Sequence, residues 1–445
     1  MDAIGEWLEQ RGISEVEVLV PDLVGNARGK FIPTAQYLGG ALPRLPESVL
    51  AQSVTGEYSA DHWDFVEPTD ADMVLKPDAT TLRPVPWARK PTAQIVHDCY
   101  TMADSPHPLS TRNVLRRVLA LYEAEGWRPV IAPEMEFYLL ERNVDKAAPL
   151  RPPVGRSGRA ETAPQSYSID AVAEFDGFVE ELYQHLAAQE LDADTLIHEN
   201  GAAQMEINFL HGDPLALADQ VFCFKRTVRE TALRHGIYAT FMAKPMQKEP
   251  GSAMHIHQSI VRVDDGSNIF VDDAGKHNQA LNSYIAGLQR FTPDLISLYA
   301  PNVNSYRRLA PDISAPINMN WGYDNRMAAF RVPHSNAAAT RVENRFPGAD
   351  ANPYLAIAAT LASGYLGMKL GLTASEPLLG AGDEETIEVA RTLEEGLRDL
   401  LRTPELVEIV GELFLRAYSA VKLTEFEEFN RIVSSWEREH LVLNV

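Results

Sequence analysis

The sequence predicts an α+β fold built from two domains of unequal size. Strand-like segments dominate up to about residue 103, and helical patterns alternate with strands from there to the end. The proline-containing segment ADSPHPLS, residues 103–110, separates the two patterns. A chain of 445 residues is long enough for two or more domains. We therefore expect a small sheet domain over residues 1–103 and a larger domain over residues 104–445.

Short β-rich segments bounded by turn residues predict the small domain. They read VEVLVPDL, ADMVLKPD, TLRPVPW and TAQIVHDCY, and the turn-rich VGNARGK follows the first of them. In the larger domain, Ser110 is a good N-cap for the helical pattern TRNVLRRVLALYEAEG. Further long helical patterns cover residues 171–190, 279–298 and 352–371, and we expect a C-terminal helical tail at about residues 424–445.

Composition restricts the partners and the compartment. The 62 acidic and 40 basic residues give a formal net charge of −22 at pH 7, which opposes non-specific binding to nucleic acid or anionic membranes. Cys99 and Cys223 are the only cysteines, so no disulfide framework is implied. The N-terminal segment MDAIGEWLEQRG is acidic and amphipathic, unlike a signal peptide, and no apolar run approaches the length of a membrane span. We predict a cytoplasmic protein without nucleic-acid or membrane partners.

Polar residues alternate along four predicted strands of the larger domain. In APEMEFYLL, Glu134 and Glu136 share one face of the strand, and Met135 lies on the other. The segments ENGAAQMEINF, SAMHIHQSI and TRVENRF alternate in the same way. Their polar positions are Gln204, Glu206 and Asn208, then His255, His257 and Ser259, then Arg341, Glu343 and Arg345, with Glu199 upstream of Gln204.

Each of these strands alone has an ordinary explanation, because an amphipathic strand with a solvated acidic face is more common than a metal site. Convergence of the four faces would gather five carboxylates in one cavity, and these cannot all ionise without cations. An oxygen-rich set with a single imidazole suits Mg²⁺ or Mn²⁺ better than Zn²⁺. The five carboxylates are those of Glu134, Glu136, Glu199, Glu206 and Glu343.

Arginines cluster in the segments NSYRRLAP, GYDNRMAAFRVP and RVENRF. A charged loop that balances surface acids is a fair explanation for Arg307, but it fits less well for Arg326 and Arg331, which flank an apolar stretch. Arginine binds phosphate and carboxylate in a bidentate manner, and divalent ions with an arginine cluster are typical of phosphoryl transfer. The sequence has neither GxxxxGK[ST] nor GxGxxG. A nucleotide would therefore be held by metals and side chains.

The chain resembles glutamine synthetases of the bacterial type, and more closely their γ-glutamylpolyamine synthetase-like relatives, which ligate glutamate to organic amines. The motifs PEMEF, HENGAAQMEINF, GSAMHIHQS, NSYRRLAP, WGYDNR and RVENRFPGADANPYLA carry the resemblance, which covers nearly the whole chain. It implies a small N-terminal β-grasp domain and a large catalytic domain whose curved antiparallel sheet forms a funnel with a neighbouring subunit. It also implies active sites between the subunits of a six-membered ring, alone as a hexamer or stacked as a dodecamer.

The resemblance also implies roles for individual residues. Glu136, Glu199 and Glu206 match the ligands of one metal, and Glu134, His255 and Glu343 match those of a second. Residues that match the glutamate site are Gly251, Arg308 and Arg345, and residues that match the ATP side are His257, Ser259, Arg326, Arg331 and Arg341. The implied catalytic groups are Arg308, Arg326 and Ser314. In the implied reaction, the γ-carboxylate of glutamate attacks the terminal phosphate of ATP, and an amine then displaces phosphate from γ-glutamyl phosphate.

Departures from the family pattern concern the second substrate. Ammonia-using synthetases carry an aspartate in an FDGSS motif and a glutamate in a flap loop, whereas here SVTGEYS and PDISAP place Thr55 and Ser314 at these positions. Glu57 lies two residues beyond Thr55, and Pro250 replaces an asparagine near glutamate. Loss of two anions weakens ammonium binding, and the smaller side chains leave room for a substituent. We therefore expect a primary organic amine as substrate, selected by Thr55, Glu57 and Ser314.

The acceptor amine and two other functions stay open at the level of sequence. The amine is a polyamine or an aromatic or alkyl monoamine. Tyr58, Trp63, Phe65 and Trp321 lie near the altered motifs, although core packing explains any one of them equally well. The other functions are glutamine synthesis from ammonia and a catalytically inactive structural or regulatory ring. The complete set of metal ligands and arginines argues against an inactive ring. A cluster of buried charges is unfavourable for folding, so relaxed selection in a protein without catalysis would be expected to remove it.

Overall fold

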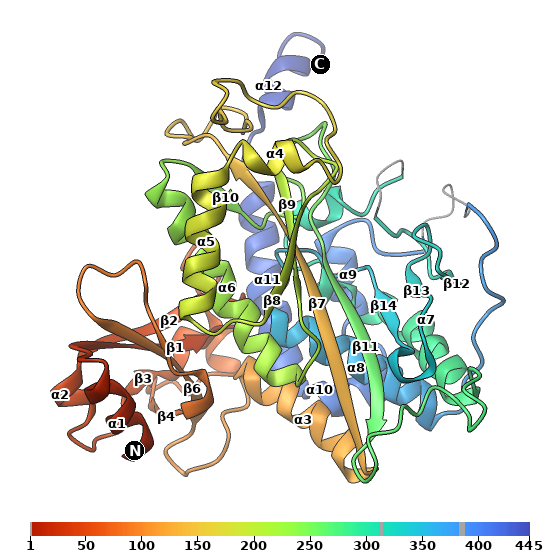
Figure 1. Ribbon diagram of the computed structural model, residues 1–445, viewed down its shortest axis with the longest axis horizontal. Helices are drawn as coiled ribbons and strands as arrows, with labels where there is room; N and C mark the ends of the chain where they lie inside the picture. The colour runs from red at the N-terminus through yellow and green to blue at the C-terminus, as the bar shows by residue number, and fades with distance from the viewer. Residues whose placement is uncertain (1, 312–314, 382–387) are drawn as a thin grey trace.

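The computed structural model describes residues 2–311, 315–381 and 388–445, which form two β-sheets and the helices that cover them (Figure 1). The first sheet has the strand order β2-β1-β6-β4-β3, with β5 paired to β6. β1 runs parallel to β6 and antiparallel to β2. Its strands are β1 (Glu15–Pro21), β2 (Ala27–Pro33), β3 (Arg44–Pro46), β4 (Asp72–Pro77), β5 (Arg83–Pro84) and β6 (Thr92–Tyr100).

Burial explains the order of the first sheet. β1 is apolar and almost wholly buried, as a central strand must be, whereas β2 contains charged residues and lies exposed at the edge. Helices α1 (Asp2–Gln10) and α2 (Thr34–Tyr37) belong to the same part of the chain, and Leu8 and Tyr37 bury their side chains in the core. The β-grasp name for this part of the chain stays a prediction.

The second sheet carries the polar strands identified in the sequence. Its order is β12-β13-β14-β11-β7-β9-β8, with β10 paired to β7, and every pair in it is antiparallel except β12 with β13. The long strands β7 and β11 cross the middle of the molecule side by side (Figure 1). The strands are β7 (Trp127–Leu140), β8 (Ala193–His198), β9 (Gln204–Phe209), β10 (Tyr238–Thr240), β11 (Met254–Arg262), β12 (Trp321–Tyr323), β13 (Phe330–Val332) and β14 (Val342–Asn344).

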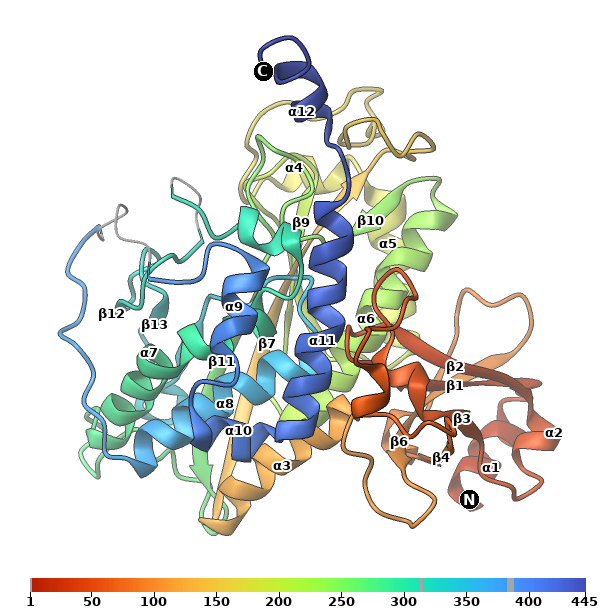
Figure 2. The ribbon, with the colours of Figure 1, turned by 180° about the vertical axis from the view of Figure 1, so that it is seen from behind.

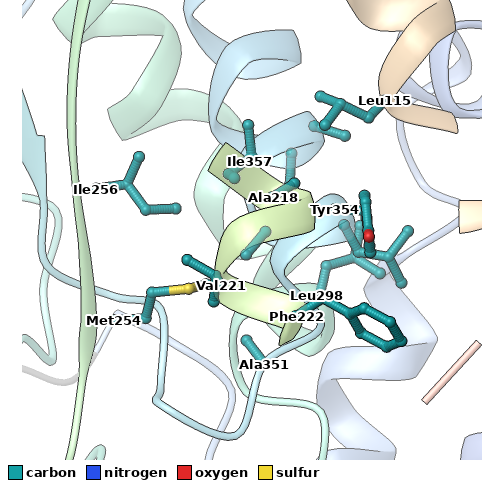
Figure 3. Close-up of a cluster of buried hydrophobic side chains, with 14 of the residues drawn as sticks. Leu115, Ala218, Val221, Phe222, Met254, Ile256, Leu298, Ala351, Tyr354 and Ile357 are labelled. Carbon is teal, nitrogen blue, oxygen red and sulfur yellow. The ribbon is translucent and has the colours of Figure 1, made fainter. Parts of the chain in front are cut away.

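Helices pack against the apolar face of this sheet and against each other. The helices are α3 (Thr111–Ala124), α4 (Ile169–Ala173), α5 (Asp176–Ala188), α6 (Pro214–Arg234), α7 (Gln279–Tyr299), α8 (Pro353–Lys369), α9 (Leu393–Asp399), α10 (Pro404–Val410), α11 (Glu412–Asn430) and α12 (Ser435–His440). Figure 3 shows Val221 and Phe222 of α6 among Met254 and Ile256 of β11 and Tyr354 of α8. Each such fully buried apolar side chain contributes about 1.5–3 kcal/mol to folding.

The structure confirms the α+β prediction, and two of the three long helical patterns match helices closely. The patterns at 279–298 and 352–371 correspond to α7 and α8, whose first turns are capped by the side chains of Asn278 and Asn352. The single helix expected over 171–190 is wrong, because the chain breaks between α4 and α5. Phe175 leaves the helical region there, with φ of −118° and ψ of 31°, and buries its side chain in the core. Tertiary packing overrides the local pattern at this residue.

A buried arginine joins the first sheet to the helices of the second. Arg112 of α3 donates from Nε to Asp219 Oδ1 of α6 at 2.9 Å and from Nη2 to Asp78 Oδ2 at 2.8 Å, and it also pairs with Asp98 of β6. Removing one partner from a buried ion network costs about 3–5 kcal/mol, so this network fixes how the two sheets sit relative to each other. Among the described residues, no helix is long and apolar enough to cross a membrane.

Candidate active site

Strand register brings the predicted ionisable residues of four strands together. Glu136 of β7 lies opposite Glu206 of β9, and Glu134 lies opposite His255 of β11. On the other edge of β11, His257 lies opposite Glu343 of β14. Because side chains of paired residues project from the same face of a sheet, these groups point into one space.

All of the paired groups except His257 line one cavity of about 320 Å³. It is lined by all six residues that were expected to bind metal, and by four of the expected arginines with Gly251. These are Glu134, Glu136, Glu199, Glu206, His255 and Glu343, then Arg308, Arg326, Arg331 and Arg345. The structure therefore places residues from distant parts of the sequence in one site, as the alternation of polar residues predicted.

Two groups of potential ligand atoms are close enough to share a metal ion. Atoms of Glu134, Glu206 and His255 lie within 4.8 Å of one another, and so do atoms of Glu134, Glu343 and His257. Glu134 belongs to both groups. Its Oε1 accepts a hydrogen bond from His257 Nε2 at 2.7 Å, and its Oε2 lies 3.3 Å from His255 Nδ1.

Burial and mutual repulsion disfavour ionisation of three carboxyl groups. Burial raises the pKa of Glu136 to about 8, with a further contribution from the charge of Glu199. Burial raises the pKa of Glu206 to about 10, with repulsion from Glu136 and Glu134 adding to the shift. The pKa of Glu199 is also raised by burial. Glu136 and Glu206 therefore hold protons at neutral pH unless cations replace them, so this donor set fits divalent ions with a preference for oxygen ligands.

The carboxylate of Glu343 behaves differently because cations surround it. Burial opposes its charge, but Arg345, His255 and His257 outweigh burial and lower the pKa of Glu343 to about 2. Arg331 Nη1 donates to Glu343 Oε2 at 2.8 Å, and Arg345 Nη1 donates to Oε1 at 2.7 Å. Glu343 thus stays ionised and holds two guanidinium groups at the edge of the cavity.

Arg308 is held by the backbone and is almost inaccessible to solvent. Its Nη1 and Nη2 donate to the carbonyl groups of Phe346 and Arg345 at 2.8 and 2.9 Å. Burial lowers the pKa of Arg308 to about 10, so the side chain remains charged at neutral pH. Gly251 is needed beside it, because a Cβ at that position would lie 2.6 Å from Arg308 Cγ. A rigid buried cation of this kind suits a carboxylate of a small substrate.

A second cavity of about 520 Å³ adjoins the first and shares Glu134 and Asn208 with it. It contains the remaining residues of the expected ATP side, His257, Ser259 and Arg341. Arg341 Nε donates to His257 Nδ1 at 3.2 Å, so the proton of a neutral His257 is on Nε2, which faces Glu134. Two polar atoms of residues that line the first cavity, Asn208 Oδ1 and Arg331 Nε, are buried and have no hydrogen-bond partner among the described residues. They are available to a ligand.

Comparison with known proteins gives a family. Residues 108–441 match the family described as glutamine synthetase, catalytic domain.

The chain belongs to the glutamine synthetase family. A glutamate–isopropylamine ligase from Pseudomonas sp is 32% identical over 98% of this chain and 96% of its own length. A γ-glutamylputrescine synthetase from Escherichia coli (strain K12) is 34% identical over 96% of this chain and 92% of its own length. A glutamine synthetase from Methanococcus maripaludis is 33% identical over 97% of both chains. A solved structure of GmaS without ligand has a TM-score of 0.85 at 25% identity and covers 99% of this chain and 100% of its own. The predicted family is confirmed.

Thr55 and Glu57, two of the residues expected to select the amine in this glutamine synthetase family member, do not line the catalytic cavity of one chain. Thr55 lines a different cavity, where its Oγ1 donates to Glu428 of α11 at 2.8 Å. Glu57 lies on the same exposed loop, and Ser314 lies outside the described residues. Among the aromatic candidates, Trp321 is buried and donates from Nε1 to a backbone carbonyl at 2.7 Å, as expected for core packing.

Several lining residues were not among the candidates from sequence. Gln204 Nε2 donates to Glu136 Oε2 at 3.2 Å and to the carbonyl of Gly251 at 3.0 Å, so it links a carboxylate to the segment beside Arg308. Gln204 lies on the polar face of its strand, a signal that was available. Tyr167 also lines the cavity, but it lies in an irregular loop and has a φ of 61°. A loop has no alternation of polar and apolar residues from which a cavity-lining position could be predicted.

Proposed function

We propose that this protein is an ATP-dependent ligase that joins the γ-carboxylate of glutamate to a primary organic amine through γ-glutamyl phosphate. The observation that carries the proposal is one cavity in which acidic metal-ligand candidates and four arginines meet. Such a set neutralises both a transferring phosphoryl group and a dicarboxylate substrate. Relatives named for isopropylamine and for putrescine support an organic amine as acceptor, either a monoamine or a polyamine.

Two or more Mg²⁺ or Mn²⁺ ions would be held by the six ionisable residues of the cavity. We assign Glu136, Glu199 and Glu206 to one ion, and Glu134, His255 and Glu343 to another. When bound, such ions would neutralise the negative charge of the phosphate groups. The raised pKa values of Glu136 and Glu206 support this assignment, because a cation relieves the repulsion between them.

The arginines would bind the two anionic substrates. We assign Arg308 and Arg345, next to Gly251, to glutamate, and we assign Arg326 and Arg331 to the phosphates of ATP. Arg308 is fixed by backbone carbonyls, and a positioned carboxylate loses little further entropy when it attacks phosphorus. ADP leaves as the γ-carboxylate becomes an acyl phosphate.

The ATP side of the site would continue into the second cavity. His257, Ser259 and Arg341 line it and offer the polar groups that we assign to the nucleotide. Arg341 lines the second cavity and Arg331 lines the first, and Glu134 lines both. A nucleotide in the second cavity would thus present its terminal phosphate toward Glu134.

The amine step would involve a neighbouring copy of the chain. We assign amine selection to Thr55, Glu57 and Ser314, and in one chain Thr55 is outside the catalytic cavity. The place of Thr55 and Glu57 on a separate loop supports a six-membered ring, single or stacked, in which the small domain of 1–103 reaches the large domain of the next subunit. The neutral amine would displace phosphate and release one proton. Light scattering in solution tests the ring, and a monomer would contradict it.

Glutamine synthesis from ammonia is the second candidate, because glutamine synthetases match this chain as well as the amine ligases do. The test is release of phosphate from ATP by the purified protein with glutamate, Mg²⁺ or Mn²⁺, and a panel of isopropylamine, putrescine and ammonia. We expect release to require glutamate and metal, and to be faster with an organic amine. Efficient turnover with ammonia alone would favour glutamine synthesis, and silence across the panel would favour an inactive ring.

A further inference from the structure

A separate cavity of about 700 Å³ lies where the small sheet meets α6 and the end of α11. We call it the junction cavity, and its key residues are Lys225, Arg229, Phe241, Arg307 and Phe429. None of its lining residues lines the catalytic cavity of the same chain, and Thr55, which we assign to amine selection with a neighbouring subunit, is among them. Figure 2 shows α11 running past the inner end of the small sheet, and α11 contacts the segment Glu47–Ala51 of that part of the chain.

The junction cavity contains three cationic side chains. Among the described residues, no carboxylate lies within ion-pair distance of Lys225, Arg229 or Arg307. Lys225 is 8% exposed, and its Nζ donates to the carbonyl of Ala351 at 2.7 Å. Arg307 Nη1 donates to the carbonyl of Val303 at 3.2 Å. A buried ammonium group with a single carbonyl acceptor is unfavourable for the free energy of folding, so an anion bound beside it would be stabilising.

Three carboxylates line the same cavity, and each has at least one oxygen that accepts a hydrogen bond from within the protein, whereas Asp350 Oδ1 is buried without a partner among the described residues. Glu425 accepts hydrogen bonds from Lys422 at 2.7 Å and from a backbone amide at 2.7 Å. Glu428 accepts from Thr55 at 2.8 Å. Asp350 Oδ2 accepts from two side chains of the segment 302–305, at 2.8 and 2.6 Å. These acids offset part of the positive charge without pairing with it, which favours a ligand with a single negative charge.

Apolar surface lies directly beside the cations. Arg229 Cζ lies 5.2 Å and Lys225 Nζ lies 5.7 Å from the centre of the Phe241 ring. Arg307 Cζ lies 5.4 Å from the centre of the Phe429 ring, and that ring is 41% exposed. A ligand with an apolar body can therefore cover these rings while its charged end reaches the cations.

We propose that the junction cavity binds a small organic monocarboxylate with an apolar body, with its carboxylate between Lys225 and Arg229. Burial lowers the pKa of Lys225 to about 7, with the charge of Arg229 adding to the shift, and an anion would favour the charged amine. Arg307 belongs to the 3₁₀ turn Val303–Arg307 and directly precedes Arg308 of the catalytic cavity. Two consecutive arginines thus line two different cavities. A ligand that contacts Arg307 in the junction cavity would be one residue away in sequence from Arg308, which we assign to glutamate.

Isothermal titration of the purified oligomer with 3-phenylpropanoate tests this site, with no ATP, glutamate or metal present. The uncharged 3-phenylpropanamide is the matched control for charge. We expect the carboxylate to bind and the amide to bind at least about tenfold more weakly, since a charge-assisted hydrogen bond contributes about 1.5–3 kcal/mol. Absence of binding, or equal binding of the two compounds, would overturn the proposal.

Variants locate the binding. Arg229→Gln changes an exposed side chain and should leave the fold intact, and Lys225→Met tests the buried amine. Each should weaken 3-phenylpropanoate binding by about tenfold or more, whereas Arg345→Gln, in the catalytic cavity, should not. Loss of binding in Arg345→Gln with retention in Arg229→Gln would place the ligand in the catalytic cavity and refute the inference. Because no turnover is measured, this result is independent of the proposed ligase activity.

Discussion

Replacing Glu343 by glutamine is the most informative single change in the catalytic cavity. Glu343 is 1% exposed, and its two oxygens accept hydrogen bonds from Arg331 and Arg345 at 2.8 and 2.7 Å. Glutamine keeps the size and one acceptor oxygen, but removes the charge that both guanidinium groups face. Hydrogen bonds to charged groups contribute about 1.5–3 kcal/mol each, so about 3–6 kcal/mol of interaction is at stake. A loss of about 3 kcal/mol in the transition state slows kcat/KM by about a hundredfold.

The assay is phosphate release under conditions where wild type turns over, with Asp324→Asn as the control. Asp324 accepts from Nη2 of the same Arg331 at 2.7 Å, but its side chain is 60% exposed. An exposed pair contributes about 0–1 kcal/mol, so this control should slow kcat/KM by less than about fivefold. Equal effects of the two variants, or near-normal activity of Glu343→Gln, would refute the view that the buried carboxylate organises the site.

Three further predictions concern packing, metal affinity and pH. Gly251→Ala should raise KM for glutamate by about tenfold with less effect on KM for ATP, because the new Cβ would displace the side chain of Arg308. Gln204→Leu should weaken binding of Mn²⁺ by about 10–100-fold in a calorimetric titration, because Glu136 loses a hydrogen-bond donor. For Lys225, the native pKa of about 7 lies below the ordinary value of 10.5, so the unfolded state binds more protons between these values. The thermal midpoint of wild type should therefore rise relative to that of Lys225→Met between about pH 7 and about pH 9, and the advantage should be lost as pH falls through 7.

Matched variants separate these effects from general damage. Gly212→Ala adds a Cβ whose nearest neighbour lies at 3.6 Å, so KM for glutamate should not move. Gln184→Leu changes an exposed glutamine on α5 and should leave Mn²⁺ affinity unchanged. Gly251→Ala or Gln204→Leu variants that behave like these controls would contradict the roles assigned here. A pH-independent difference between wild type and Lys225→Met would show that Lys225 titrates normally.

The sequence was most informative where side chains alternate on regular strands. The period of two placed Glu134 and Glu136 on one face, and pairing with neighbouring strands then brought Glu206 and His255 beside them. That outcome follows from strand geometry, because every second residue of paired strands faces the same side. The resemblance to the family motifs predicted the other residues of the cavity, including Arg308.

Residues on irregular backbone could not be predicted in the same way. Tyr167 reaches the cavity from a loop with positive φ, and a loop shows no regular alternation of polar and apolar residues. Phe175 breaks an expected helix because burial of its ring outweighs the local preference for helix. The position of Thr55, beside α11 instead of in the catalytic cavity, depends on packing between segments more than three hundred residues apart in sequence.

One competition experiment tests the central claim most directly. The purified protein is given ATP, Mg²⁺, glutamate and equal concentrations of ammonia and isopropylamine, and the products are identified by mass spectrometry, with putrescine replacing isopropylamine in a parallel reaction. The account predicts that a γ-glutamyl amide of an organic amine exceeds glutamine in at least one of the two reactions. Glutamine as the main product in both would contradict it.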